Sequence, residues 1–208
     1  MSATLGFLVS GLFLGLTAGT APGPLLTLVL SETLKHGKKE GVKIAVCPLI
    51  TDLPIVLLAF LVLTRLEGHN WIIGVISIFG ACYLVYLGLR NLTVGIEAYE
   101  TNHVKQGVLR RGIIANFLSP YPYLFWLSIG GPMISKSLDM HMSATILFIL
   151  GFYIMLVVSK IGVAVVAEES KSLIRRKYHL HIVRVLGLAL ILFALSFAKD
   201  GLELVGLL

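Results

Sequence analysis

Long apolar runs dominate this sequence and limit what it can fold into. A run of about 18 or more apolar residues can cross a bilayer as a helix. Charged residues make up 13% of the chain, whereas about 25% is usual for a soluble domain. The sequence therefore predicts an all-α integral membrane protein with six transmembrane helices and no separate soluble domain. The six apolar runs cover residues 5–30, 44–64, 71–89, 112–134, 144–167 and 182–198.

Basic residues alternate between the two sides of these predicted helices. Most of the 17 Lys and Arg lie in or beside the first, third and fifth loops, whereas Arg65, Lys136 and Lys199 lie on the other side. Because Lys and Arg are enriched in cytoplasmic loops, we expect a multi-pass protein of the cytoplasmic membrane with both termini on the extracytoplasmic side. The alternation also favours membrane lipid over nucleic acid as the partner of the net charge of +6.

The first apolar run contains a proline pair where a membrane helix is expected to be continuous. Pro22 and Pro24 flank Gly23. A proline lacks the helical N–H and clashes with the carbonyl four residues before it. An unsatisfied carbonyl is costly in hydrocarbon, so a broken membrane helix is tolerated where it faces protein or a wet cavity. We therefore expect this break, with Gly19 and Thr20 beside it, to take part in a binding site.

Glycines precede this break at a spacing of four residues. Gly11 and Gly15 lie on the face of the predicted helix that also carries Gly19. Small residues at this spacing let membrane helices approach closely. We therefore expect Gly11 and Gly15 to serve packing.

A second proline pair lies at the corresponding place in the other half. Pro120 and Pro122 flank Tyr121 early in the fourth run, and Asn116 comes one turn earlier. Interrupted segments at corresponding places in two halves point to the binding site of a transporter. Because three helices per half turn the second half over in the membrane, the sequence predicts a 3+3 inverted-topology repeat. Its halves are residues 1–105 and 106–208, with helices 1 and 4 broken at the Pro-x-Pro motifs.

Charges of opposite sign lie near the middle of the second and fifth runs. They are Asp52, which follows Thr51, and Lys160. A central aspartate costs about 2.5–3.5 kcal/mol on insertion scales, so each charge is a functional-site candidate. Burying Asp52 and Lys160 as an ion pair would cost less free energy than burying either charge alone. The alternatives are that Asp52 only bonds a neighbouring helix and that Lys160 extends toward the interface.

Two cysteines, Cys47 and Cys82, lie in different apolar runs and form no CxxC motif. We expect both to be small core residues. A membrane thiol–disulfide electron carrier is one alternative function, but it needs a reactive cysteine in each half, and both cysteines lie in the first. A metal or inorganic cation exporter is another, with Asp52, Cys47 and carbonyl oxygens as ligands. The chain has neither a His-rich loop nor clustered carboxylates to favour it.

Together these motifs resemble the LysE/RhtB family of amino-acid exporters. The family signature is a glycine-spaced first helix leading to Pro-Gly-Pro, a basic loop with paired glycines, and Gly-Asp in the second helix. Thr51 stands in place of the glycine before the aspartate, and Pro122 departs from the usual second-half motif. The positions that match the signature are Gly15, Gly19, Pro22, Gly23, Pro24, Gly37, Gly41 and Asp52, with Asn116 and Pro120 in the second half.

This resemblance implies a secondary transporter, not an enzyme, that needs no cofactor. It would export a small amino acid or similar zwitterion, coupled to an ion or proton, from a midplane site between the repeats. The oligomeric state stays open, a homo-oligomer included. The expected substrate- or ion-binding residues are Asp52, Lys160, Asn116, Thr20, Pro22, Gly23, Pro24, Pro120, Pro122, Gly19, Thr51 and Tyr121.

Overall fold

The computed structural model describes residues 2–65, 71–93, 107–173 and 176–207, and these form helices without any strand. Within these described residues, three helices are long and apolar enough to cross a membrane: α5 (Trp71–Leu92), α10 (Met142–Leu173) and α11 (Arg176–Val205). A bent pair, α1 and α2, makes a fourth candidate span. The all-helical membrane architecture is thus confirmed, while six spans stay a prediction. The predicted boundary between the halves, at residue 105, lies outside the described residues.

The first apolar run folds as two helices at an angle of 62°. Helix α1 (Ser2–Thr20) ends just before the first proline pair, and α2 (Pro24–His36) begins on its second member. Proline is favoured at the first helical position, because no intrahelical partner is lost there. Helix α3 (Lys38–Ala45) follows at once, since Gly37 turns the chain with a φ of 98°. The basic segment expected as a loop is therefore two helix ends joined by one glycine.

The fourth apolar run is divided into short helical pieces. Helix α7 (Val108–Phe117) ends before the second proline pair, and α8 (Pro120–Phe125) begins on Pro120. A π-helical turn, η1 (Trp126–Gly130), and α9 (Gly131–Leu138) complete the run. The second apolar run forms α4 (Cys47–Arg65), which carries Pro54 in its interior. These pieces position the side chains of the candidate site.

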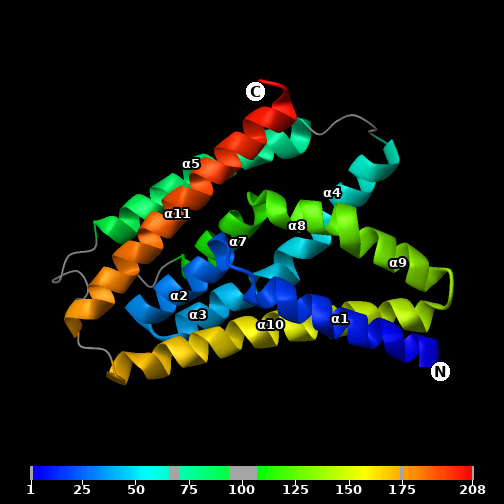
Figure 1. Ribbon diagram of the computed structural model, residues 1–208, viewed down its shortest axis with the longest axis horizontal. Coiled ribbons are helices and arrows are strands. Elements are labelled where there is room, and N and C mark those ends of the chain that lie inside the picture. The colour runs from blue at the N-terminus through cyan, green and yellow to red at the C-terminus, as the bar shows by residue number, and fades with distance from the viewer. Residues whose placement is uncertain (1, 66–70, 94–106, 174–175, 208) are drawn as a thin grey trace.

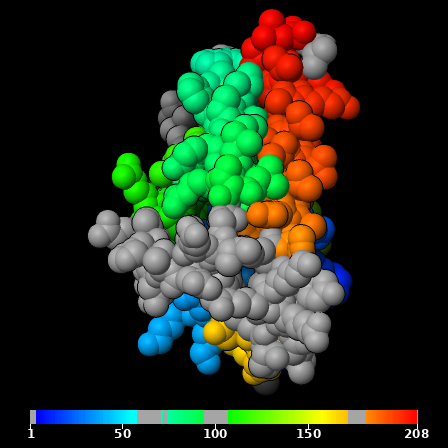
Figure 2. All heavy atoms as spheres, turned by 90° about the vertical axis from the view of Figure 1, so that its left-hand side faces the viewer, coloured from blue at the N-terminus to red at the C-terminus, as the bar shows by residue number. Residues whose placement is uncertain are grey.

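Two helix pairs enclose the rest of the molecule. Helices α1 and α10 run side by side along the lower edge of Figure 1, and α5 packs along α11 at the upper left. Helices α2, α3, α4 and α7 to α9 lie between the pairs. Figure 2, which looks at the left-hand end of that view, shows α5 and α11 adjacent above the ends of α3 and α10.

Close glycine contacts explain how each pair packs. A Cβ on Gly11 or Gly15 would collide with the α10 carbonyls of Phe148 and Phe152, so the predicted packing role is confirmed. Between α5 and α11 the contact is reciprocal. A Cβ on Gly88 would lie 2.8 Å from the Gly187 carbonyl oxygen, and one on Gly187 would lie 2.9 Å from that of Gly88. Larger residues would force these helices apart.

The two cysteines differ in their surroundings. Cys47 is fully buried where α4 begins, and a Cβ on Gly112 of α7 would lie 2.6 Å from its sulfur. Its expected role as a small core residue is confirmed. The same expectation for Cys82 is wrong, because Cys82 is exposed on α5. An apolar run cannot distinguish a core-facing side chain from an outward-facing one, since a membrane protein is apolar on both sides.

Candidate functional site

Both helix breaks line one cavity of about 390 Å³. The first break contributes Pro22, Gly23 and Pro24, and the second contributes Ser119, Tyr121 and Pro122. The charges predicted from the sequence reach the same cavity, Asp52 from α4 and Lys160 from α10. A cavity of this size with a few convergent polar groups is typical of a small-molecule binding site. The structure thus brings together four segments that are far apart in sequence.

Lys160 is anchored at the end of α1. Its side chain is 4% exposed, and Nζ donates to the carbonyl oxygen of Gly19 at 3.1 Å. That carbonyl has no helical donor because α1 ends at Thr20. The buried ammonium therefore caps the broken helix, and the capped carbonyl lies next to Ala18, which lines the cavity.

The start of α2 lies at the cavity wall and has backbone N–H groups without a helical acceptor. The first helical bond of α2 runs from the N–H of Thr27 to the carbonyl of Gly23. The N–H groups of Leu25 and Leu26 come before it, and both residues line the cavity. Gly23 supplies no side-chain cap. An uncapped helix N-terminus attracts an anion through its N–H groups and its dipole.

Asp52 is held from the second half of the chain. Its side chain is 4% exposed, and Asn116 Nδ2 donates to Asp52 Oδ1 at 3.2 Å. The same amide lies 2.6 Å from the hydroxyl oxygen of Thr51, which in turn bonds the Cys47 carbonyl at 3.0 Å. Asn116 therefore joins α7 to α4 and fixes the carboxylate. Trp126 and Tyr153 also lie beside this carboxylate.

Asp52 and Lys160 both line the cavity and attract each other without direct contact. They are close enough to interact electrostatically. Yet the ion pairs within 4.0 Å in the described part of the chain do not include them. The space between a buried anion and a buried cation suits a ligand that carries both charges, because each group on the protein then gains a partner.

One wall of the cavity is aromatic. Phe125 stacks on Phe152 with ring centroids 5.0 Å apart, and Trp126 meets Phe152 edge to face at 5.4 Å. A Cβ on Gly130 would collide with the Trp126 ring, so this glycine leaves room for the indole in the π-helical turn. The sequence did not single out Phe152 or Leu156. Phe152 and Leu156 precede Lys160 by eight and four residues, and this spacing places all three on one face of α10. That spacing was the one sign in the sequence that they belong to the site.

Most of the predicted site residues line this cavity, and four take other places. Gly19 supplies the carbonyl that Lys160 binds, and Thr51 supports Asn116. Pro120 is buried at the start of α8. Thr20 is exposed and bonds the Leu16 carbonyl within α1. The predicted residues that line the cavity are Asp52, Lys160, Asn116, Pro22, Gly23, Pro24, Pro122 and Tyr121.

A family model matches most of this sequence. The model for the LysE type translocator matches residues 16–201, which include both helix breaks and both cavity charges. The chain belongs to the LysE type translocator family. It is therefore a membrane transporter of the exporter type, and the resemblance drawn from the sequence motifs is confirmed.

One curated relative extends this comparison over nearly the full length. The translocator is 19% identical over 205 residues to a Bacillus subtilis (strain 168) protein named "Putative amino acid efflux protein YcgF". The matched region covers 96% of this chain and 98% of that protein. No solved structure matches the translocator.

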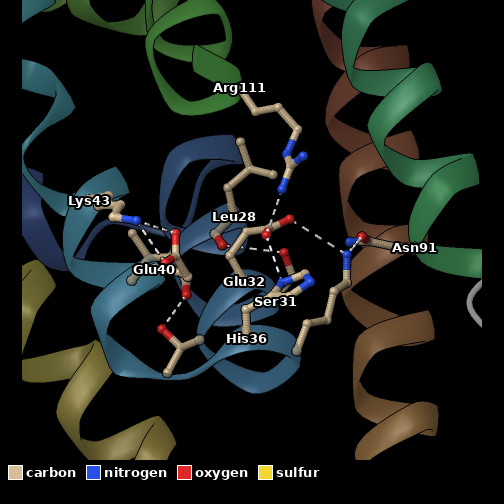
Figure 3. A network of polar contacts seen from close by, with 11 residues as sticks. Leu28, Ser31, Glu32, His36, Glu40, Lys43, Asn91 and Arg111 are labelled. Atoms are coloured by element: carbon tan, nitrogen blue, oxygen red, sulfur yellow. Dashed lines mark hydrogen bonds and ion pairs between the residues drawn. The ribbon is translucent and has the colours of Figure 1, made fainter. Parts of the chain in front are cut away.

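A second buried charge cluster lies beyond the cavity, about 9 Å further along α2. Figure 3 shows Glu32 between Arg111 of α7 and His36. Glu32 Oε2 lies 2.8 Å from Arg111 Nη2 and 3.1 Å from His36 Nδ1. Lys35 pairs with Glu32 and also donates to Asn91 of α5. This cluster joins α2, α5 and α7. Sequence reasoning missed it because Glu32 lies at the edge of an apolar run and Arg111 was interpreted as an orientation signal.

The alternative functions find little support in this geometry. Within the described ranges, no group of three or more His, Cys, Asp or Glu residues is arranged to hold a metal ion. The two cysteines are both free thiols. Neither cysteine lines the cavity that holds Asp52 and Lys160.

Proposed function

We propose that this translocator is a secondary transporter that exports an amino acid or similar zwitterion across the cytoplasmic membrane. The observation that carries the proposal is the placement of Asp52 and Lys160 in one cavity without a direct ion pair. A zwitterion placed between them would neutralise both, and a buried charge is tolerated only when it has a partner. The name of the Bacillus relative agrees with an amino-acid substrate.

In the proposed complex, each charged group of the substrate meets a complementary group of the cavity. The ammonium faces Asp52 and the carbonyl of Ala18, whose helical donor position is taken by Pro22. The carboxylate faces Lys160 and the backbone N–H groups of Leu25 and Leu26. Half-helix N-termini serve as anion sites in other secondary transporters with broken helices.

The proposed transport cycle depends on two inverted halves, residues 1–105 and 106–208. Support comes from the packing: the pairs α1 with α10 and α4 with α7 and α8 each join one half to the other. Residues of both Pro-x-Pro motifs, Pro22 to Pro24 and Tyr121 with Pro122, line the cavity between these pairs. Rocking of one half against the other would expose this site to each side in turn. With six spans and the basic loops in the cytoplasm, both termini lie on the extracytoplasmic side.

Coupling is assigned to Asp52. This carboxylate can bind a cation or a proton, and Asn116 holds one of its oxygens in place. The coupling ion or proton and the substrate ammonium would then compete for one carboxylate, so that Asp52 carries one of them at a time. Asparagine has nearly the same shape but no negative charge with which to bind either.

The test is counterflow in proteoliposomes with wild type and Asp52→Asn, together with thermal shifts of the purified protein. We expect amino acids to raise the melting temperature of wild type and Asp52→Asn to abolish coupled transport. Asp139→Asn, at an exposed position after α9, is the matched control. If Asp52→Asn transports as well as wild type, Asp52 is not the residue that binds the coupling ion or proton. Shifts with metal salts but with no amino acid would favour a metal or inorganic cation exporter instead.

A further inference from the structure

We propose that the cavity selects amino acids whose side chain is uncharged and apolar, and that Phe152 and Trp126 are the specificity-determining residues. This inference rests on the proposed function, because it specifies the substrate of the same site. It follows from the charges of the cavity lining, the position of its aromatic wall, and the face of α10 that carries both Phe152 and Lys160.

Among the described residues that line the cavity, Asp52 is the anion and Lys160 is the cation. The α-ammonium of the substrate neutralises Asp52, and its α-carboxylate neutralises Lys160. The other polar side chains of the lining, Asn116, Ser119 and Tyr121, carry no charge. A basic or acidic substrate side chain would therefore bring a third charge into the cavity without a partner. Burying an unpaired charge is strongly unfavourable, so such substrates are rejected.

The remaining lining offers apolar surface for the substrate side chain. Phe125, Trp126, Phe152 and Leu156 form a continuous wall, since Phe152 contacts both Phe125 and Trp126. Phe152 and Trp126 are 2% and 3% exposed, so their rings are already desolvated before a substrate binds. An apolar side chain that fills the adjacent space loses contact with water and gains contact with these rings, whereas a polar one loses hydrogen bonds.

Helix α10 fixes the distance between the wall and the carboxylate site. Phe152, Leu156 and Lys160 succeed one another every four residues on one face of α10. Phe152 therefore lies about 12 Å along the axis from Lys160, with Leu156 between them. A substrate whose carboxylate meets the Lys160 ammonium can thus direct its side chain along this face toward the rings. Aliphatic and aromatic side chains suit this geometry.

Phe148 provides a natural control on the same helix. It lies one turn before Phe152, is fully buried against α1, and does not line the cavity. Substituting either phenylalanine by leucine removes a similar amount of buried aromatic surface from α10. Only the change at Phe152 alters the surface that the substrate would contact.

The experiment measures competition by L-leucine, L-phenylalanine, L-lysine and L-glutamate in counterflow. In wild type we expect L-leucine or L-phenylalanine to compete at least about tenfold better than L-lysine and L-glutamate. We expect Phe152→Leu and Trp126→Phe to change the ratio of L-phenylalanine to L-leucine at least about threefold. Phe148→Leu should leave this ratio unchanged. The expected changes in ratio reflect altered contact between side chain and wall.

The outcomes separate this inference from the proposed function. If no amino acid competes, the proposed function itself fails. If L-lysine or L-glutamate competes as well as L-leucine, export of amino acids stands and the selectivity inference is overturned. An equal change of ratio in Phe148→Leu and Phe152→Leu would overturn the role of Phe152. Should the variants not fold, as judged by thermal unfolding, the order of competition in wild type decides.

Discussion

Lys160 Nζ donates to the carbonyl oxygen of Gly19 at 3.1 Å, across 141 positions of sequence. The bond joins the middle of α10, in the second half of the sequence, to the end of α1, in the first half. A lysine in this position does two things at once. It satisfies a carbonyl that the helix break has left without a donor, and it brings a positive charge to the cavity wall. The break and the charge are therefore parts of one structure.

Lys160→Met is expected to weaken amino-acid binding by at least about tenfold, because one charge-assisted hydrogen bond contributes about 1.5–3 kcal/mol. The variant also leaves the Gly19 carbonyl without its side-chain donor, which costs about 1–3 kcal/mol of stability. Lys160→Arg keeps the charge and should retain more binding. Thermal shift with increasing L-leucine measures both effects. Lys136→Met, at an exposed position on α9, is the control. Unchanged L-leucine affinity in Lys160→Met would contradict the carboxylate assignment.

The buried pair of Glu32 and Arg111 is expected to contribute to stability through the packing of α2 on α7. Removing one partner of a buried ion pair typically costs about 3–5 kcal/mol, because the other charge is left uncompensated. Arg111→Met should lower the free energy of unfolding less than Glu32→Gln does. When Arg111 is removed, Glu32 still has Lys35 and His36 as partners. The double variant should be less destabilised than the sum of the single variants. Chemical unfolding in detergent gives these values.

Lys199→Met is the control for this double-mutant cycle. Lys199 pairs with Glu203 at 3.6 Å within α11, and both side chains are exposed. Exposed pairs of this spacing on a helix contribute about 0.3–0.5 kcal/mol. A loss in Lys199→Met as large as that in Glu32→Gln would show that burial and the link between helices are not what matters.

The sequence predicted the elements of the site whose chemistry is unusual for a membrane. Two proline pairs and two charges stand out against apolar runs because each is costly in hydrocarbon without a structural reason. Asp52, Lys160, Asn116 and both breaks could therefore be found from the sequence, and the structure places them at one cavity. The inverted repeat, inferred from the same motifs, stays a prediction.

Some residues owe their role to the direction in which the side chain points, and not to an unusual chemical type. These residues could not be found from the sequence in this way. Phe152 and Leu156 are ordinary apolar residues of an apolar helix, and only their spacing from Lys160 distinguishes them. Cys82 faces outward although its surroundings in sequence are apolar. Glu32 and Arg111 lie 79 positions apart, and their pairing depends on how α2 packs against α7. Such facts follow from tertiary packing, which a single sequence does not encode in any local pattern.

Gly15→Ala is expected to destabilise the protein by about 1–3 kcal/mol, because the added methyl group meets the backbone carbonyl of Phe152 and forces α1 away from α10. The matched control is Gly162→Ala on α10, where nothing lies within 4 Å of an added Cβ. That change should be neutral or stabilise by about 0.4–1 kcal/mol, since alanine restricts the unfolded chain. Thermal unfolding of both variants checks the difference. Similar melting temperatures would argue against close packing of α1 on α10.

Asn116→Ala is expected to reduce transport by about 10–100-fold while leaving the charge of Asp52 in place. The amide donates to the Asp52 carboxylate at 3.2 Å and approaches the Thr51 hydroxyl at 2.6 Å, so its loss releases the carboxylate from α7. A hydrogen bond to a charged group typically contributes about 1.5–3 kcal/mol, which corresponds to a factor of about 10–100. Counterflow measures the rate, and substrate titration separates affinity from turnover.

Thr51→Val tests whether the effect passes through Asp52. It removes the hydroxyl and keeps nearly the same shape, while the bond from Asn116 to Asp52 remains available. We therefore expect Thr51→Val to lose about two- to tenfold in transport rate, less than Asn116→Ala loses, since a neutral hydrogen bond contributes about 0.5–1.5 kcal/mol. If Thr51→Val is as impaired as Asn116→Ala, the hydroxyl and not the carboxylate is the group that Asn116 serves. If neither variant is impaired, Asn116 has no part in positioning Asp52, and the carboxylate is held by Trp126 and Tyr153 alone.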